Sequence, residues 1–146
     1  TKFNFSTELQ EVQKRVLIGV SDLYKDLPNI TKEANQKFDF LFFNNPLIGQ
    51  DVNNSDKTSV DSFAGKNFEV NINAITEFPN VIHLAGSAYF LVVDSQLPLP
   101  NIWTTEHLKK TLPHGWEYKQ CSPSVFIDEN IGIEAYVVCV SRILKN

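Results

Sequence analysis

The sequence predicts an α+β fold built as one domain over residues 1–146, and three observations support this prediction. The length of 146 residues is that of one ordinary domain. The composition, with 42% hydrophobic residues and with 11 Phe, 4 Tyr and 2 Trp, supplies enough apolar side chains for a core. Apolar residues follow a helical period near the N-terminus and strand-like patterns afterwards. We therefore expect an N-terminal amphipathic helix packed on a mainly antiparallel sheet of about five or six strands.

The first predicted element is the amphipathic helix, over residues 6–26. Ser6 or Thr7 supplies a helix cap, and Gln10 follows Thr7 at the spacing of a capping box. Pro28 disfavours helical geometry at the residue before it, so we expect the helix to end there. The apolar stripe, which we expect to pack on the sheet, consists of Leu9, Val12, Val16, Val20 and Leu23.

Three stretches in the middle of the chain have strand character. Residues 37–43, KFDFLFF, are rich in aromatic residues. Residues 68–74, FEVNINA, alternate apolar and polar side chains, which predicts a half-exposed strand with Glu69 outside. Residues 81–94 are apolar on both faces and are divided at Gly86, so they predict two successive strands or one long bent strand with a bulge. One side of the first stretch carries Phe38, Phe40 and Phe42.

The remaining elements are predicted in the C-terminal third of the chain. A short helix near 104–112 begins at Thr104 or Thr105, both of which are good capping residues. The run GWEYKQC at 115–121 starts another strand. The runs SVFID and IGIEAYVVCVSRILK then form a C-terminal β-hairpin, because the DEN tripeptide at 128–130 between them is a turn signal.

Of the two cysteines of the chain, Cys121 ends the run at 115–121 and Cys139 lies in the second strand of this predicted hairpin. A register that places Val125 opposite Ala135 also places Cys121 opposite Cys139. We expect two reduced core thiols with Cys139 buried, and a disulfide or a reactive thiol is the alternative. Because no CxxC or HxH spacing occurs, we expect no metal site and no cofactor.

Acidic residues are unevenly distributed along the chain. Residues 51–106 contain seven acids and two lysines, a formal charge of −5, whereas the rest has ten acids and eleven bases, a charge of +1. A nucleic-acid-binding protein would show the opposite bias, and the longest apolar run, AYFLVV, is too short to span a membrane. We therefore expect no nucleic-acid or membrane partner and an acidic surface that meets a basic protein, as in an immunity protein that neutralises a nuclease toxin. The expected contact residues are Asp51, Asp56, Asp61 and Glu69.

No motif of a hydrolase, a phosphate-binding loop, a dinucleotide site or a zinc protease occurs in the sequence. The prediction is therefore a non-enzymatic binding protein, and two alternatives stay open. An enzyme or small-ligand domain would have a concave pocket with converging polar groups. A structural subunit of a larger assembly would expose a large apolar patch or a long open strand edge. The residues for the enzyme or ligand alternative are His83, Tyr89, His114 and Trp116.

The residue usage also indicates an origin and a compartment. Lysine outnumbers arginine eleven to two, and Asn, Ile and Phe are plentiful, as in AT-rich genes of bacterial accessory proteins. Two reduced thiols are expected in a reducing compartment, so we expect a cytoplasmic location.

Overall fold

The structure is a computed structural model that describes residues 22–31, 37–47, 66–98, 101–128, 130 and 132–143. The chain forms two compact units, Thr1–Gln36 and Lys37–Asn146, and we call the second one the sheet unit. The prediction of one domain over residues 1–146 stays a prediction.

The described part of the first unit contains one short helix, α2, at Leu27–Thr31. The expectation that Pro28 ends a helix is wrong, because Pro28 lies in the first turn of α2. Amide groups of a first turn have no partner within the helix, so proline is tolerated there. The hydroxyl of Thr31 donates to the Leu27 carbonyl at 2.8 Å and closes the helix. Residues 6–21 of the helix predicted over 6–26 lie outside the described residues. Residues 22–26 form a bend and turns, so the prediction is wrong for this part, and Leu23 has a positive φ of 53°.

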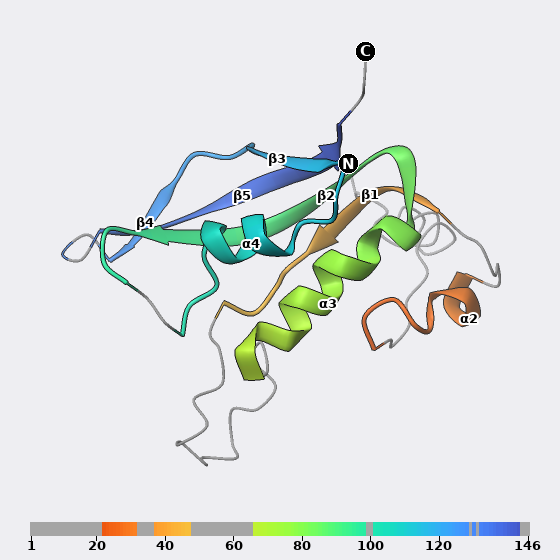
Figure 1. Ribbon diagram of the computed structural model, residues 1–146, viewed down its shortest axis with the longest axis horizontal. Helices are drawn as coiled ribbons and strands as arrows, with labels where there is room; N and C mark the ends of the chain where they lie inside the picture. The colour runs from red at the N-terminus through yellow and green to blue at the C-terminus, as the bar shows by residue number, and fades with distance from the viewer. Residues whose placement is uncertain are drawn as a thin grey trace, which may run out of the picture. The chain divides into compact units, whose positions relative to one another are not determined.

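The sheet unit is α+β and contains a mixed five-stranded sheet with strand order β1-β2-β5-β3 (Figure 1). The strand β4 also pairs with β5, beyond the end of β3. The prediction of a mainly antiparallel sheet holds for three of the pairs, but β1 and β2 are parallel. A parallel pair requires a crossover connection, and the helix α3 lies in that connection. The strands are β1 Phe38–Phe43, β2 Ile82–Ser95, β3 Trp116–Gln120, β4 Val125–Asp128 and β5 Ile133–Arg142.

The strand β2 is one long strand whose pairing with β1 is irregular near Gly86. Phe38 is opposite Ile82, but Phe40 is opposite Ser87, so β2 contains extra residues between the two pairs. The second of the two alternatives for residues 81–94, one long strand with a bulge, therefore describes the structure. A Cβ atom on Gly86 would lie 2.8 Å from the carbonyl oxygen of Asp39, which explains why glycine occupies this position.

The stretch 68–74, predicted as a strand, is instead helical: residues 69–74 belong to the helix α3, Glu69–Glu77, and Phe68 is its N-cap. The prediction relied on alternation, yet the same residues also have a helical period. Phe68, Asn71, Ile75 and Phe78 are all buried, at spacings of three, four and three. Short 3₁₀ turns at Lys66–Phe68 and Phe78–Asn80 flank the helix. The segment that connects the parallel strands β1 and β2 thus contains a helix, in agreement with the helical spacing of its buried residues.

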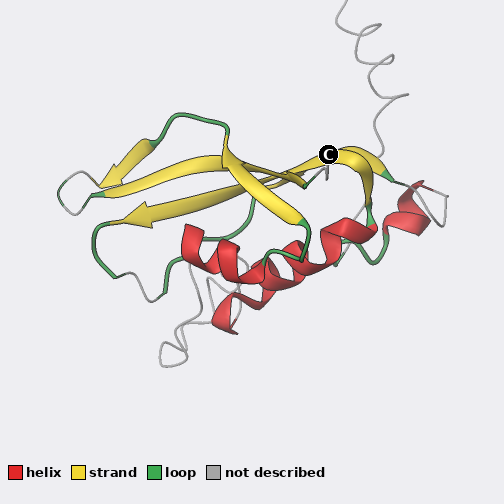
Figure 2. Cartoon of the chain, turned by 45° about the horizontal axis from the view of Figure 1, so that its top comes forward, coloured by secondary structure: helices red, strands yellow, loops and turns green. Residues whose placement is uncertain are grey.

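The helix α4 spans Thr105–Thr111, with Thr104 as its N-cap, as predicted. His107 occupies the third helical position, and its side chain accepts a hydrogen bond from the Thr104 backbone amide at 3.2 Å. Both α3 and α4 cover the same face of the sheet (Figure 2). The core lies between these helices and the sheet, and its largest fully buried apolar side chains are Trp103, Phe78, Phe90, Ile75, Leu108, Val92, Val93, Val138 and Val140.

The strands β4 and β5 are antiparallel, and Val125 lies opposite Ala135 as predicted. A register shift follows, because Asp128 is opposite Ile133 rather than Gly132. The strand β3 follows a different register on β5, in which Lys119 is opposite Cys139. The prediction that Cys121 lies opposite Cys139 is therefore wrong, since it carried the β4 register into a segment that follows the β3 register.

Candidate functional site

One face of the sheet lies away from α3 and α4, and we call it the open face. Directly opposed residues of neighbouring strands project to the same face, so the register identifies its members. Phe42 is opposite Tyr89, Tyr89 is opposite Cys139, and Cys139 is opposite Lys119. The neighbouring rows are Phe40, Ser87, Ser141 and Glu117 on one side and Leu91 and Val137 on the other.

The part of the open face at β1 and β2 is rich in aromatic residues. The Phe42 side chain is 74% exposed and that of Phe40 is 63% exposed. The Phe42 ring stacks on the Tyr89 ring, with 4.7 Å between ring centroids and 9° between planes. Beside the stacked pair lies a shallow depression of about 210 Å³ that reaches Leu91 and Val137. Two large, highly exposed phenylalanines in one patch are the usual sign of an interaction surface.

Charged residues are confined to one edge of the open face. Among the rows defined above, only Glu117 and Lys119 carry charge, and both belong to β3. The strand β1 lies at the opposite edge of the sheet. Among the residues that the structure describes, the aromatic part of the open face therefore carries no charged side chain, as expected for the centre of a protein interface.

The strand β1 that carries this patch is firmly held. Beyond its end, the side-chain amide of Asn45 donates to the Leu91 carbonyl at 3.0 Å, and its oxygen accepts from the Leu91 amide at 2.9 Å. The Asn45 side chain thereby continues the pairing with β2 past the end of the strand. Asn71 of α3 in turn donates to the Pro46 carbonyl at 2.8 Å. These bonds make β1 a rigid platform for Phe40 and Phe42.

A second group of exposed apolar residues lies on β4. Val125, Phe126 and Ile127 are 66%, 54% and 58% exposed, respectively. Val125 belongs to the open face because it is opposite Ala135, whereas Phe126 projects to the other side. The strand β4 pairs with β5 at the other end of the β5 strand from Arg142, so this group is separate from the Phe40 and Phe42 patch.

The two cysteines are both free and lie near each other on the open face. The Cys121 amide donates to the Val137 carbonyl at 3.0 Å, so Cys121 is diagonal to Cys139 rather than opposite it. Diagonal pairs have Cα atoms about 7–8 Å apart, beyond the usual span of a disulfide. Partial desolvation and, secondarily, the nearby Cys139 thiol raise the pKa of Cys121, which favours the protonated form. Cys121 is exposed and Cys139 half-buried, so the expectation of two core thiols is wrong.

The Tyr89 hydroxyl lies close to the Cys139 thiol. The negative charge that Cys139 would carry, together with partial burial and a hydrogen bond to the thiol, raises the pKa of Tyr89. Tyr89 therefore stays neutral at physiological pH, and the open face gains no charge from it.

The four residues of the predicted acidic surface are not brought together by the described structure. Asp51, Asp56 and Asp61 lie outside the described residues. Glu69 is exposed in the first turn of α3, where its carboxylate is favourable next to the positive end of the helix dipole. Because α3 covers the other face of the sheet, Glu69 is not part of the open face.

The residues of the enzyme or ligand alternative are only partly brought together. His114 and Trp116 line one shallow depression of about 400 Å³, which Lys109 and Tyr118 also line. The Trp116 ring packs against Phe78 at 4.7 Å between centroids. Tyr89 lies instead on the open face, and His83 is exposed near the start of β2.

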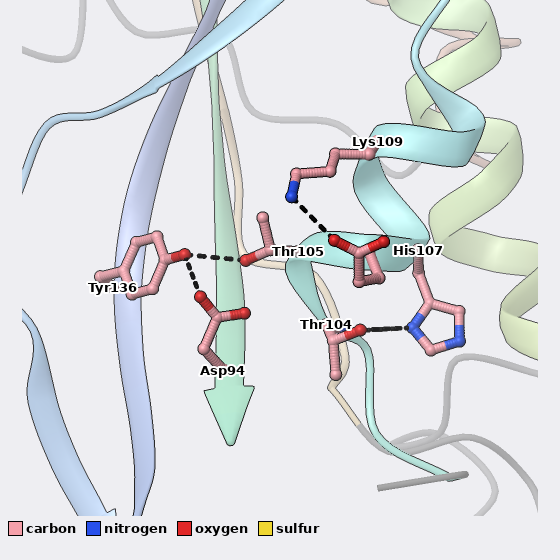
Figure 3. Close-up of polar contacts among 7 residues, drawn as sticks. Asp94, Thr104, Thr105, His107, Lys109 and Tyr136 are labelled. Atoms are coloured by element: carbon pink, nitrogen blue, oxygen red, sulfur yellow. Dashed lines mark hydrogen bonds and ion pairs between the residues drawn. The ribbon is translucent and has the colours of Figure 1, made fainter. Parts of the chain in front are cut away.

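Sequence reasoning missed a polar cluster beneath α4 (Figure 3). The Tyr136 hydroxyl donates to Oδ2 of Asp94 at 2.6 Å and lies 2.8 Å from the Thr105 hydroxyl. Burial and the bond to the Asp94 carboxylate raise the pKa of Tyr136. The cluster ties α4 to β2 and β5, and no sequence signal indicates it because its members are far apart in the chain.

His107 lies at the edge of the same region. Its ring stacks on Trp103 at 5.4 Å and contacts Phe68 at 4.8 Å between centroids. Burial, and secondarily the charge of Lys110, lowers the pKa of His107, so the ring is neutral at pH 7. A neutral ring nitrogen is required to accept the hydrogen bond from the Thr104 amide, so His107 serves as a helix cap.

Within the described ranges, no three His, Cys, Asp or Glu side chains are grouped so that they would hold a metal ion. Among the helices described above, none has the length and apolar character needed to cross a membrane. No protein-family model matches this chain, and no curated protein matches it either.

Proposed function

We propose that this protein acts by binding another protein, without catalysis, and that the open face around Phe40 and Phe42 is its main contact. The observation that carries the proposal is the pair of highly exposed phenylalanines on a rigid, uncharged part of the sheet. Fully burying one phenylalanine contributes roughly 1.5–3 kcal/mol. Aromatic residues on a flat apolar surface are typical of the residues that dominate binding energy.

The proposal includes a basic partner, for example a nuclease toxin that the protein neutralises as an immunity protein. The support for this part is the formal charge of −5 on residues 51–106. The first acid of that stretch, Asp51, follows Phe43 by eight residues, so the chain leads directly from β1 into the acidic segment. In such an interface the aromatic residues supply affinity, and the acids accelerate encounter with a basic protein. A cytoplasmic location belongs to the same proposal, and the two free cysteines support it.

A small-ligand site is the second candidate function. The observation that favours it is the depression that His114 and Trp116 share with Lys109. The site would suit a small ligand that contacts Trp116, whose ring already packs against Phe78 and lies under the Arg142 guanidinium. Replacement of Trp116 with Leu removes this contact, so loss of ligand binding in that variant, with the protein-binding surface unaffected, would favour this candidate.

The test of the main proposal uses two matched variants of the full chain. Phe42→Asp places a charge in the patch formed by Phe40 and Phe42, which we call the aromatic patch. Phe126→Asp places the same charge on an exposed phenylalanine of β4. The immobilised parent is used to capture partners from an extract of the source organism, and each captured protein is purified and titrated against the three chains. We expect Phe42→Asp to weaken binding by about tenfold or more and Phe126→Asp to leave it unchanged. Equal binding by all three chains would contradict the proposal.

A further inference from the structure

We infer that the aromatic patch also binds a second copy of this chain, through antiparallel pairing of β1 with β1 of that copy about a two-fold axis. The inference rests on the proposed function in its choice of surface and adds the identity of one occupant. Three properties of β1 carry it: a free edge, a self-complementary pattern of side chains and exposed aromatic area.

The first property is the free edge. In the described part of the chain, β1 pairs with β2 on one side only, and no described strand pairs with its other side. Proteins block such edges with proline, lysine or a bulge on the edge strand. The six residues FDFLFF contain no proline and no lysine, and Asp39 is their only charged residue. The strand thus presents an unblocked row of backbone donors and acceptors.

The second property is self-complementarity. When two copies of β1 pair antiparallel and are centred on Leu41, Phe40 of each copy lies opposite Phe42 of the other. Both phenylalanines are on the open face, so two cross-strand aromatic pairs form on the same side of the joined sheet. Asp39 of each copy lies opposite Phe43 of the other, so the two aspartates do not face each other. The charged residues of the open face, Glu117 and Lys119, lie on β3 at the far edge.

The third property is the area available for burial. With about 200 Å² for each phenylalanine side chain, the exposed fractions of 63% and 74% correspond to roughly 270 Å² per chain from Phe40 and Phe42 alone. Two copies together double this area, and the paired backbones of six residues add to it. The four phenylalanines thus contribute at most roughly 540 Å², well below the roughly 1,200 Å² of a standard specific interface, so we expect a weak, reversible dimer.

Sedimentation velocity of the full chain over a wide range of protein concentration tests the inference. We expect a concentration-dependent shift from monomer to dimer in the parent, and a dissociation constant raised about tenfold or more by Phe42→Asp. Phe126→Asp is the control and should dimerise like the parent. A parent that stays monomeric at all concentrations, or equal effects of the two variants, would overturn the inference.

A charge exchange tests the register of the pairing. In the double variant Phe40→Glu with Phe42→Lys, each glutamate lies opposite a lysine of the other copy. This variant should dimerise less tightly than the parent, because aromatic burial is lost, but measurably. In the double variant Phe40→Lys with Phe42→Lys, like charges are opposed and dimerisation should be lost. Equal loss in both would contradict the antiparallel register.

The outcomes separate this inference from the proposed function. A monomeric parent whose partner binding is lost in Phe42→Asp overturns the dimer and supports the proposed function. A dimeric parent whose partner binding is indifferent to Phe42→Asp supports the dimer and contradicts the proposed function.

Discussion

At the scale of single residues, Tyr136 and His107 show how polar side chains are used inside this protein. Tyr136 is 9% exposed, yet its hydroxyl has two partners, Asp94 and Thr105, on two different elements. The ring of His107 is half-buried between aromatic rings, and burial favours its neutral form. Both residues hold α4 in place, and each makes a measurable prediction.

Replacing Tyr136 with Phe should lower the free energy of unfolding by about 1–3 kcal/mol, because Thr105 and the Asp94 carboxylate each lose a hydrogen-bond partner under α4. Urea denaturation of parent and variant measures this difference. Tyr89→Phe is the control, because Tyr89 lies on the open face. Loss of the Tyr89 hydroxyl should change the free energy of unfolding less. Equal effects of the two substitutions would mean that the cluster contributes nothing specific.

The stability of the protein should fall as the pH drops below the ordinary histidine pKa of about 6.5. The pKa of His107 is lowered by folding, so the unfolded chain binds a proton more readily. The contribution of neutral His107 to the free energy of unfolding is therefore complete above the pKa of the unfolded chain. It is lost as the pH falls from that pKa toward the lower pKa of the folded protein. His107→Gln keeps a capping oxygen without titrating, so its unfolding free energy should depend less on pH in this window. His83→Gln, at an exposed site, should behave like the parent.

At the scale of elements, the sequence predicted those strands and helices whose pattern has one interpretation. The strand at 38–43 and the helix after Thr104 have such patterns, and both predictions are confirmed. The stretch FEVNINA fits both periods, and only the need for a crossover between parallel strands selects the helix. Sequence alternation also placed Phe40 and Phe42 on one side of β1. It does not show whether helices cover that side, so the sequence prediction missed the open face.

Gly86 gives a prediction at this scale. Gly86→Val should destabilise the fold by about 1–3 kcal/mol or more, because its side chain would push β1 away from β2. A Cβ atom there would lie 2.8 Å from the Asp39 carbonyl oxygen and 2.7 Å from Cγ1 of Ile82. Thermal unfolding monitored by circular dichroism measures the effect. Gly115→Asn is the control, because no atom lies within 4 Å of its Cβ position and asparagine tolerates its φ of 85°. A Gly86→Val chain as stable as the parent would mean that the two strands separate freely.

At the scale of the whole molecule, hydrophobic and acidic features are distributed over different parts of the chain. The aromatic patch belongs to β1 and β2, whereas the acids at 51, 56 and 61 belong to the segment that follows β1 in sequence. Net charge and its distribution follow from the sequence alone. The positions of the charges in space depend on the fold. The predicted group of four acids therefore included Glu69 as a strand residue, although Glu69 lies on α3.

Reversing two acids, Asp56→Lys with Asp61→Lys, should weaken the complex with a basic partner by about 1 kcal/mol or more per well-placed residue. The parent complex should also form more slowly as salt rises, because screening removes long-range attraction. Association rates measured by surface plasmon resonance at low and high salt, for both chains, check this prediction. Rates that respond to neither change would show that the acidic segment plays no part in binding.

The position of β5 in the sheet has a consequence for biosynthesis. The strand β5 pairs with β2, β3 and β4, although it follows all of them in the chain. During synthesis, β1 to β4 therefore leave the ribosome before β5, although β2, β3 and β4 all need β5 as a pairing partner. Until residues 133–142 emerge, only the parallel β1–β2 ladder is complete, and parallel ladders between distant segments form slowly. The nascent chain must spend that interval with unpaired, apolar strands exposed, so its yield in cells should depend on chaperones that shield such strands.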